Sequence, residues 1–276
     1  MPPVITSIGT FKQSLTGGAF EALAAATADS LSIIAFPDAD SAYVEEVIAG
    51  NSAHKMEVAI FSPRFGDNQF GLRLQQMFNP TLSGADGVPQ LLAPRVLDIP
   101  VYSTDTLNVQ VNGTAADNAD VVLQLYYTNI QGAGQRLAQW AQIEPNIVRV
   151  LGIEVTVTPG ATGNYGTAVA LNANDDRLQA DQDYALLGYV TDQPVLSIGI
   201  KGPDTGFYRI PMPGHWDTRN TADWFVQQDT WRATPHIPVI NANNRATTFL
   251  DGIDPANPGA TKVSLVLAQL GSRFLG

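Results

Sequence analysis

The chain contains no cysteine, only three histidines and few charged residues, which make up 15% of its 276 residues. Without cysteine it can form neither a disulfide framework nor a thiolate nucleophile. Its charged fraction lies below the roughly one quarter that soluble domains usually carry. A long apolar run is also missing, because Glu21, Asp29 and Ser30 interrupt the most apolar stretch. No membrane-spanning helix is therefore expected.

The charge that is present is mainly negative. Fifteen basic and 26 acidic residues give a formal net charge of −11, with no basic stripe. Because phosphate contacts dominate nucleic-acid affinity, specific binding to nucleic acid is not expected. Met1-Pro2-Pro3 is a poor start for a signal peptide. Low charge with 24 Gly and 18 Pro suits a protein packed against copies of itself, and it also suits many secreted β proteins.

Three segments of the first half reappear in the same order in the second half. Their offsets are 140, 138 and 142 residues (203 − 63, 237 − 99 and 263 − 121). A period this long indicates two copies of one domain, since solenoid repeats are about 20–50 residues long. We expect Pro63 to overlie Pro203, and Ile99 to overlie Ile237, within a residue or two. The matching segments are 58–63 with 198–203, 99–101 with 237–239, and 121–125 with 263–267.

Short apolar or alternating runs, separated by Gly, Pro, Asn and Asp clusters, predict β-sandwiches. In the run 106–111, for example, Leu107, Val109 and Val111 share one face, and Asn112-Gly113 follows as a turn. The expected strands are 31–36, 42–48, 55–61, 71–77, 96–102, 106–111 and 121–128 in the first half, and 147–158, 168–171, 184–190, 195–201, 207–212, 237–240, 247–250 and 262–270 in the second.

Helical patterns are scarce. The Ala-rich stretch 18–28 is expected to hold a short helix, and 132–143 a linking helix around Trp140. A third helix is expected at 220–228, with Thr221 as its N-cap. It lies in a long connection between two strands, and the stretch 79–92 forms a long connection at the same point of the strand order in the first half.

The expected fold class is therefore all-β: two tandem jelly-roll β-sandwiches with a few short helices. The expected division is a first sandwich at 1–131, a linking helix at 132–145 and a second sandwich at 146–276. In the duplicated endings, the helix near Trp140 and the total length, the chain resembles the viral double jelly-roll major capsid proteins. The resemblance covers most of the chain and is architectural.

This resemblance implies a self-assembling shell subunit without catalytic activity. Such a subunit is usually a trimer with a pseudo-sixfold outline, its sandwiches upright on the shell, in contact with other virion proteins. The uneven loop composition of the two halves leaves the lineage open, and with it the presence of an internal membrane beneath the shell.

No constellation of residues indicates catalysis. His54, His215 and His236 are far apart, and no H-E-x-x-H motif is present. Loop packing or an intersubunit contact is expected for them. The glycine spacing at 160–166 leads from strand to strand without a helix, so it predicts a flexible loop and no phosphate site.

Acidic residues gather in two loops, and both are expected to be solvated. A calcium site is the alternative, because calcium takes several carboxylate and carbonyl oxygens. A glycosidase pair would need two carboxylates about 5–10 Å apart across a cleft. No catalytic, cofactor or metal residue is therefore assigned. The loop carboxylates are Asp175, Asp176, Asp181, Asp183, Asp251 and Asp254, and the strand carboxylates are Glu45, Glu46, Glu57 and Glu154.

Aromatic and arginine residues cluster in the second half, and they are the candidate interface residues, since Trp and Arg often anchor protein interfaces. Packing in the local core and a platform for carbohydrate stacking remain open for them. In a helix at 220–228, Trp224 and Phe225 point about 100° apart. We expect one ring to enter its own sandwich and the other to face a neighbouring subunit or the other copy of the domain. The six candidates are Trp216, Arg219, Trp224, Phe225, Trp231 and Arg232.

Three functions are compatible with these features. The first is a bacteriophage or other viral capsid shell subunit that assembles as a trimer. The second is another virion protein, such as a decoration, penton or fibre-base subunit. The third is a secreted or surface β-sandwich that binds or cleaves carbohydrate, which would act as a monomer and need a stacking Trp.

Overall fold

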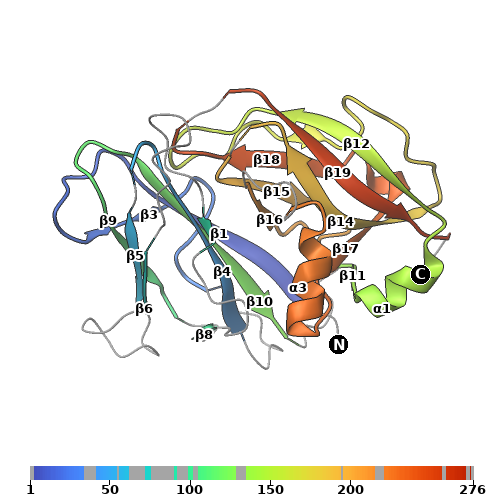
Figure 1. The fold of residues 1–276 in the computed structure, drawn as a ribbon, viewed down its shortest axis with the longest axis horizontal. Helices are drawn as coiled ribbons and strands as arrows, with labels where there is room; N and C mark the ends of the chain where they lie inside the picture. Colours follow the sequence, from blue (N-terminus) through green and yellow to red (C-terminus); the bar gives the residue numbers. More distant parts are fainter. Residues whose placement is uncertain are drawn as a thin grey trace.

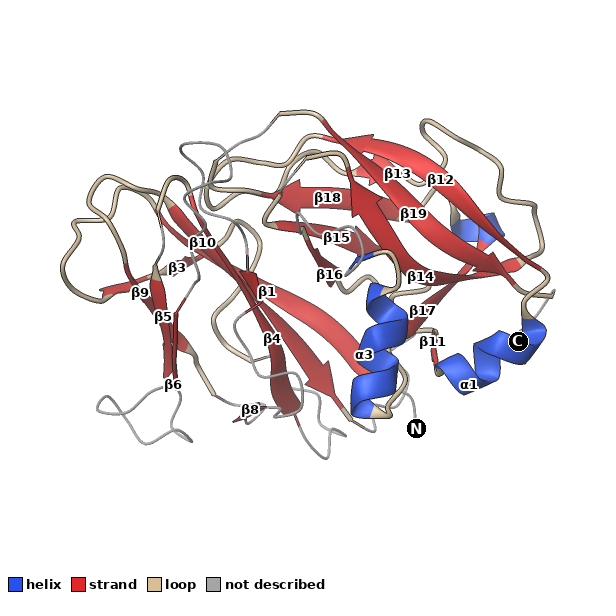
Figure 2. Ribbon diagram, viewed as in Figure 1, coloured by secondary structure: helices blue, strands red, loops and turns tan. Residues whose placement is uncertain are grey.

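The computed structural model describes residues 3–33, 42–54, 56–61, 72–75, 90–91, 99–101, 105–128, 135–193, 195–214, 221–256, 259–271 and 274. Its strands form four antiparallel sheets. Two β-sandwiches lie side by side, with few short helices (Figures 1 and 2). The expected all-β fold class is confirmed.

Within its described residues, the first sandwich contains ten strands. In its larger sheet the order is β3-β1-β10-β4, with β7 and β8 both paired to β4, and in its smaller sheet it is β2-β9-β5-β6. The strands are β1 (Val4–Lys12), β2 (Glu21–Ala22), β3 (Ala24–Ala25), β4 (Ala42–Asn51), β5 (Glu57–Phe61), β6 (Leu72–Gln75), β7 (Gln90–Leu91), β8 (Ile99–Val101), β9 (Asn108–Asn112) and β10 (Ala119–Tyr127).

In the part that the structure describes, the second sandwich contains nine strands. In its larger sheet the order is β11-β17-β14-β19-β12, and in its smaller sheet it is β13-β18-β15-β16. The strands are β11 (Leu137–Ala138), β12 (Arg149–Val157), β13 (Val169–Ala170), β14 (Asp183–Thr191), β15 (Ser197–Lys201), β16 (Ile210–Pro213), β17 (Ile237–Asn241), β18 (Phe249–Ile253) and β19 (Thr261–Gln269).

The two sandwiches share one strand order. The path β1-β10-β4-β8 corresponds to β12-β19-β14-β17, and β2-β9-β5-β6 corresponds to β13-β18-β15-β16. The residue pairs match too: Ile60 faces Leu72 on β6, and Ile200 faces Ile210 on β16. Ile99 and Ile237 accordingly lie in corresponding strands, while Pro63 lies outside the described residues.

Both larger sheets also contain a β-bulge at the same point. Between β10 and β4 the register shifts at Gln124/Leu125, which leaves Glu45 as the extra residue of β4. Between β14 and β19 it shifts at Leu186/Gly188, which leaves Leu187 as the extra residue of β14. A bulge bends its strand and re-aims a side chain. Glu45 and Leu187 are therefore equivalent positions with different chemistry.

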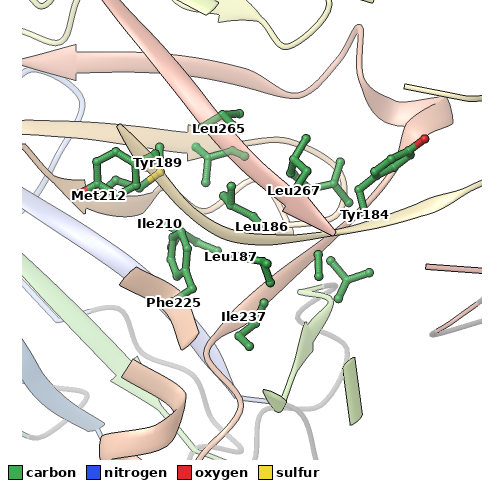
Figure 3. Packing of buried hydrophobic residues seen from close by; sticks show 14 of the residues in the cluster. Tyr184, Leu186, Leu187, Tyr189, Ile210, Met212, Phe225, Ile237, Leu265 and Leu267 are labelled. Atoms are coloured by element: carbon green, nitrogen blue, oxygen red, sulfur yellow. The ribbon is translucent and has the colours of Figure 1, made fainter. Parts of the chain in front are cut away.

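Each sandwich encloses its own apolar core. One cluster of buried side chains comes from β1, β4, β5, β9 and β10. The other fills the second sandwich, where Tyr184, Leu186, Ile210 and Leu267 meet between the sheets (Figure 3). Ile5 of the first half joins this second cluster. The cores therefore touch where the two sandwiches meet.

Most of the expected strands are present. Of the fifteen expected segments, only 31–36 has no strand in its described part, where Ser32 forms an isolated bridge with Thr106. Strand β1 was not predicted, because Thr6, Ser7, Gly9 and Thr10 interrupt its apolar pattern. Its β-branched residues were the available signal.

The helix expected at 18–28 is wrong, because β2 and β3 lie there. Glu21 accepts hydrogen bonds from the backbone N–H groups of Thr16 and Gly17, and Leu23 N–H donates to the Val109 carbonyl at 2.9 Å. Pairing with neighbouring strands outweighs the helix propensity of alanine here.

The two other expected helices are present but displaced. The described part of 132–145 contains β11 followed by α1 (Trp140–Ile143) and the start of a 3-10 turn η2 (Glu144–Asn146). The third helix, α3, runs from Trp224 to Arg232, with Asp223 as its N-cap, so the predicted Thr221 cap is wrong. A last 3-10 turn, η3, spans Ala242–Asn244. None of the described helices is long and apolar enough to cross a bilayer.

Candidate functional site

The candidate interface residues are largely inside the chain. Trp224 and Phe225 are each only 2% exposed. Figure 3 shows the Phe225 ring beside Ile210 in the core of the second sandwich. Helix α3 stands between the two sandwiches (Figure 1). Neither of these two rings is therefore available to a neighbouring subunit, and a ring that faces the other copy of the domain, the second possibility expected, stays a prediction.

The remaining candidates differ in their surroundings. Trp231 is half-buried in the last turn of α3. The Arg232 side chain is 3% exposed and pairs within the chain, so it does not anchor an outer surface. Trp216 and Arg219 lie outside the described residues. An intersubunit role stays a prediction for Trp216, Arg219 and Trp231.

Arg232 belongs to a buried polar cluster that joins the two sandwiches, which we call the junction cluster. Its Nε lies 3.2 Å from Glu45 Oε1, and its Nη2 lies 3.3 Å from Glu46 Oε1 and donates to the Glu45 carbonyl at 2.8 Å. Both carboxylates are 1% exposed and come from β4 of the first sandwich. These ion pairs therefore link α3 to β4 without contact with water.

His236 completes the junction cluster. Its Nε2 lies 3.1 Å from Glu45 Oε1, and its Nδ1 lies 2.8 Å from the Thr234 carbonyl. Both ring nitrogens face acceptors, so the arrangement suits the charged imidazolium, which donates from both. The ring stacks on Tyr126 of the first sandwich at a centroid distance of 4.9 Å.

The pKa values of this pair follow from the geometry. Burial alone would raise the pKa of Glu45, but His236, Arg232 and a hydrogen bond from Gln124 outweigh it, and the pKa is lowered. Burial alone would lower the pKa of His236, but the charge and hydrogen bond of Glu45 outweigh it, and the pKa is raised. The fold therefore favours the charged form of each residue over its ordinary tendency to ionise.

A second polar cluster ties the sandwiches together near β1. Arg209 binds Asp251 through two hydrogen bonds of 2.9 and 2.7 Å, and its Nη1 lies 3.6 Å from Asp29 of the first half. The guanidinium lies 3.5 Å from the centre of the Tyr165 ring, and the Tyr165 hydroxyl donates to Asp29 at 3.0 Å. Burial raises the pKa of Asp29.

The glycine-rich loop at 160–166 takes part in this contact between the sandwiches. It was predicted to be a flexible loop, but its backbone is hydrogen-bonded to the first half. Its Gly163 N–H donates to Asp120 at 3.0 Å, and the Gly163 carbonyl accepts from Thr27 N–H at 2.9 Å. Asp120 and Thr27 belong to the first half. Burial and, to a smaller extent, the charge of Asp254 raise the pKa of Asp120 to about 7, despite the Gly163 hydrogen bond.

The acidic loops, for which a calcium site was the alternative, hold no metal cluster within the described residues. Among the described residues, no three His, Cys, Asp or Glu side chains are grouped to hold a metal ion. The loop carboxylates bind arginines instead: Asp175 pairs with Arg177, Asp176 with Arg245 and Asp183 with Arg136.

The other titratable residues singled out in the sequence lie apart from one another. His54 Nδ1 lies 2.8 Å from Asp117, and His215 lies outside the described residues. Glu45 and Glu46 are enclosed in ion pairs, so they do not face each other across an open cleft. The sequence reasoning missed the junction cluster because a helix supplies Arg232 almost 190 residues after β4.

Comparison with known proteins gives weak likenesses only. No family model and no curated protein matches the chain. Among solved structures, a chain of Desmodium yellow mottle tymovirus matches 46% of this chain and 80% of its own length, with 11% identity and a TM-score of 0.23.

Two longer matches are similarly distant. A chain of the T=1 Penaeus vannamei nodavirus matches 97% of this chain and 98% of its own length, with 8% identity and a TM-score of 0.22. The STIV MCP matches 99% and 88%, with 10% identity and a TM-score of 0.21. Likenesses this low do not place the chain in a family.

Proposed function

We propose that this chain is a structural virion protein, a double jelly-roll shell subunit that assembles with copies of itself and has no catalytic activity. The duplicated sandwich supports this most directly. Two sets of eight strands share one order, one pairing pattern and one bulge position, at Glu45 and Leu187. Eight strands in two facing sheets are the size of a jelly roll.

The way the sandwiches are joined supports the same role. Buried ion pairs hold α3 to β4, and the Arg209 cluster holds the second contact. A shell subunit must transmit its orientation from one neighbour to the next, and two buried contacts fix the sandwiches against each other. Three copies of such a rigid pair present six similar sandwiches, which gives the proposed trimer its pseudo-sixfold outline.

The outer edge of the second sandwich offers a surface for assembly. Strand β12 is the last in its sheet, so one side of its backbone is available for pairing. Val150 on this strand is 56% exposed, and Val148 just before it is 67% exposed. A specific contact needs about 1,000 Å² or more of buried surface. We propose that β12 lies within such a contact between subunits.

The division into a first sandwich at 1–131, a link at 132–145 and a second sandwich at 146–276 belongs to this proposal. So do a location in the virion, a bacteriophage source, contacts with other virion proteins and an internal membrane beneath the shell. The low charged fraction and the acidic net charge support packing against protein more than against nucleic acid.

Replacement of Val150 by Asp tests the assembly surface. Because Val150 is exposed in the subunit, the variant keeps the stability of the parent. The charge would be buried in the contact between subunits, so the concentration needed for assembly should rise about tenfold or more. Sedimentation velocity across a concentration series measures this. Glu154→Gln, on the same face of the same strand, is the matched control. Assembly of Val150→Asp at the parent concentration would contradict the proposed surface.

A carbohydrate-binding β-sandwich is the second candidate function. One observation favours it: a polar cavity with an exposed aromatic ring at its rim, between the two sandwiches. Carbohydrate binding and shell assembly are compatible in one chain.

A further inference from the structure

A cavity of about 270 Å³ lies between the two sandwiches, next to the Arg209 cluster. One wall comes from β1 and the loop after β3, and the other from the end of β15 and the turn that follows it. It lies just below the roughly 300–1,000 Å³ of drug-sized ligand sites. Its size therefore suits one small ring. Among its lining residues are Ser7, Asp29, Ser30, Lys201, Phe207 and Arg209.

Phe207 lies at this cavity with an exposed ring and an unfavourable backbone conformation. Its side chain is 62% exposed, and its backbone φ is 60°, in the left-handed region. A bulky residue with this φ is an outlier, and such strain is typical of ligand clamps and active sites. The exposed phenyl ring gains little from burial in the free chain, so nothing in its own packing compensates for the strain.

The turn that carries Phe207 is built rigidly. Phe207 N–H donates to the Gly202 carbonyl at 2.9 Å, and the buried Thr205 hydroxyl bonds Gly202 as well. Asp204 fixes the turn to the neighbouring strand by accepting from Asn241 N–H at 2.9 Å. The ring is therefore presented in one position before any ligand arrives, which lowers the entropy cost of binding.

The opposite wall offers hydroxyl groups. Ser30, in the loop after β3, is exposed on this wall. Ser30 Oγ accepts one hydrogen bond, from Ser32 N–H at 3.2 Å, and keeps its own hydrogen available.

The charges around the cavity cancel. Asp29 and Asp251 balance Arg209 and Lys201, and within the described chain no carboxylate lies in ion-pair range of the Lys201 ammonium. A phosphate or a strongly anionic ligand would need an excess of positive charge here. A neutral ligand with several hydroxyl groups fits the balance better.

We propose that this cavity binds one neutral pyranose ring of a carbohydrate, with the apolar face of the ring on Phe207 and its hydroxyls toward Ser30 and Lys201. The exposed aromatic ring supplies apolar contact area, and the polar wall supplies donors and acceptors, as in other small-molecule sites. The site does not require assembly, so it goes beyond the proposed shell function.

The test is saturation-transfer NMR on the full chain with methyl glycosides of glucose, galactose, mannose and N-acetylglucosamine. At least one glycoside is expected to bind. Phe207→Ala should weaken that binding about tenfold or more, and Ser30→Ala should weaken it measurably. Phe249→Ala, which removes another exposed phenyl ring outside the cavity lining, is the matched control and should bind as the parent does.

Measurements of stability and assembly distinguish a ligand-binding role of Phe207 from a structural or intersubunit role. Because the ring is exposed and its backbone strained, Phe207→Gly should melt no lower than the parent and also lose binding. If no glycoside binds, or if the Phe207 variants bind as the parent does, the proposed site is wrong. If Phe207→Ala assembles poorly while its glycoside binding is unchanged, the ring is an intersubunit contact and the site is likewise wrong.

Discussion

Replacement of Arg232 by Met removes the positive charge at the centre of the junction cluster and keeps the stem of the side chain. Glu45 then retains its ion pair with His236, and Glu46, which is also 1% exposed, retains the hydrogen bond from Gln228 at 3.1 Å. Breaking one side of a buried ion pair typically costs about 3–5 kcal/mol, because the remaining charge stays buried without a partner. At about 2–4 °C per kcal/mol, the melting temperature should fall by roughly 6–20 °C.

Urea unfolding followed by far-UV circular dichroism measures this loss. A second variant that adds Glu46→Gln should recover part of it, since one of the uncompensated charges is then removed. Arg177→Met is the control, because its partner Asp175 lies in an exposed pair, and it should unfold as the parent does. A loss below about 1 kcal/mol for Arg232→Met, as seen for exposed pairs, would refute the view that this cluster joins the sandwiches.

Two further substitutions test the packing between and within the sandwiches. The folded-state pKa of Asp120 is raised from 3.8 to about 7, so ionisation of this residue destabilises the fold as the pH rises from about 4 to 7. Asp120→Asn, which can still accept from Gly163, should therefore gain stability relative to the parent up to pH 7 and keep a constant gain above it; an advantage that shrinks with rising pH would contradict this. Phe225→Ala should lose about 3–5 kcal/mol in thermal or urea unfolding, because its ring fills the second core. A parent-like melting temperature would show that the ring packs loosely.

The strands could be predicted from the sequence because their patterns are local. In 106–111 the alternation of Leu107, Val109 and Val111 predicts the buried face of β9, and all three side chains are at most 1% exposed. The match between 121–125 and 263–267 predicts the equivalence of β10 and β19, which holds to the position of the bulge.

The junction could not be predicted because it depends on long-range contacts. Nothing near Glu45 in the sequence indicates that His236 and Arg232 will surround it. The same is true of Trp224 and Phe225. Their spacing on a helix predicts rings that point in different directions, one into its own sandwich and one toward a neighbour or the other copy of the domain. Both rings are buried, and the position of α3 between the two sandwiches, which only the fold supplies, accounts for this (Figure 1).

Electron microscopy of the purified protein, combined with its mass in solution, tests the central claim most directly. If the chain is a double jelly-roll shell subunit, it should form trimers with a pseudo-sixfold outline, and closed particles or sheets as the concentration rises. A strictly monomeric species at high concentration, with no ordered assembly in the images, would contradict the proposed role.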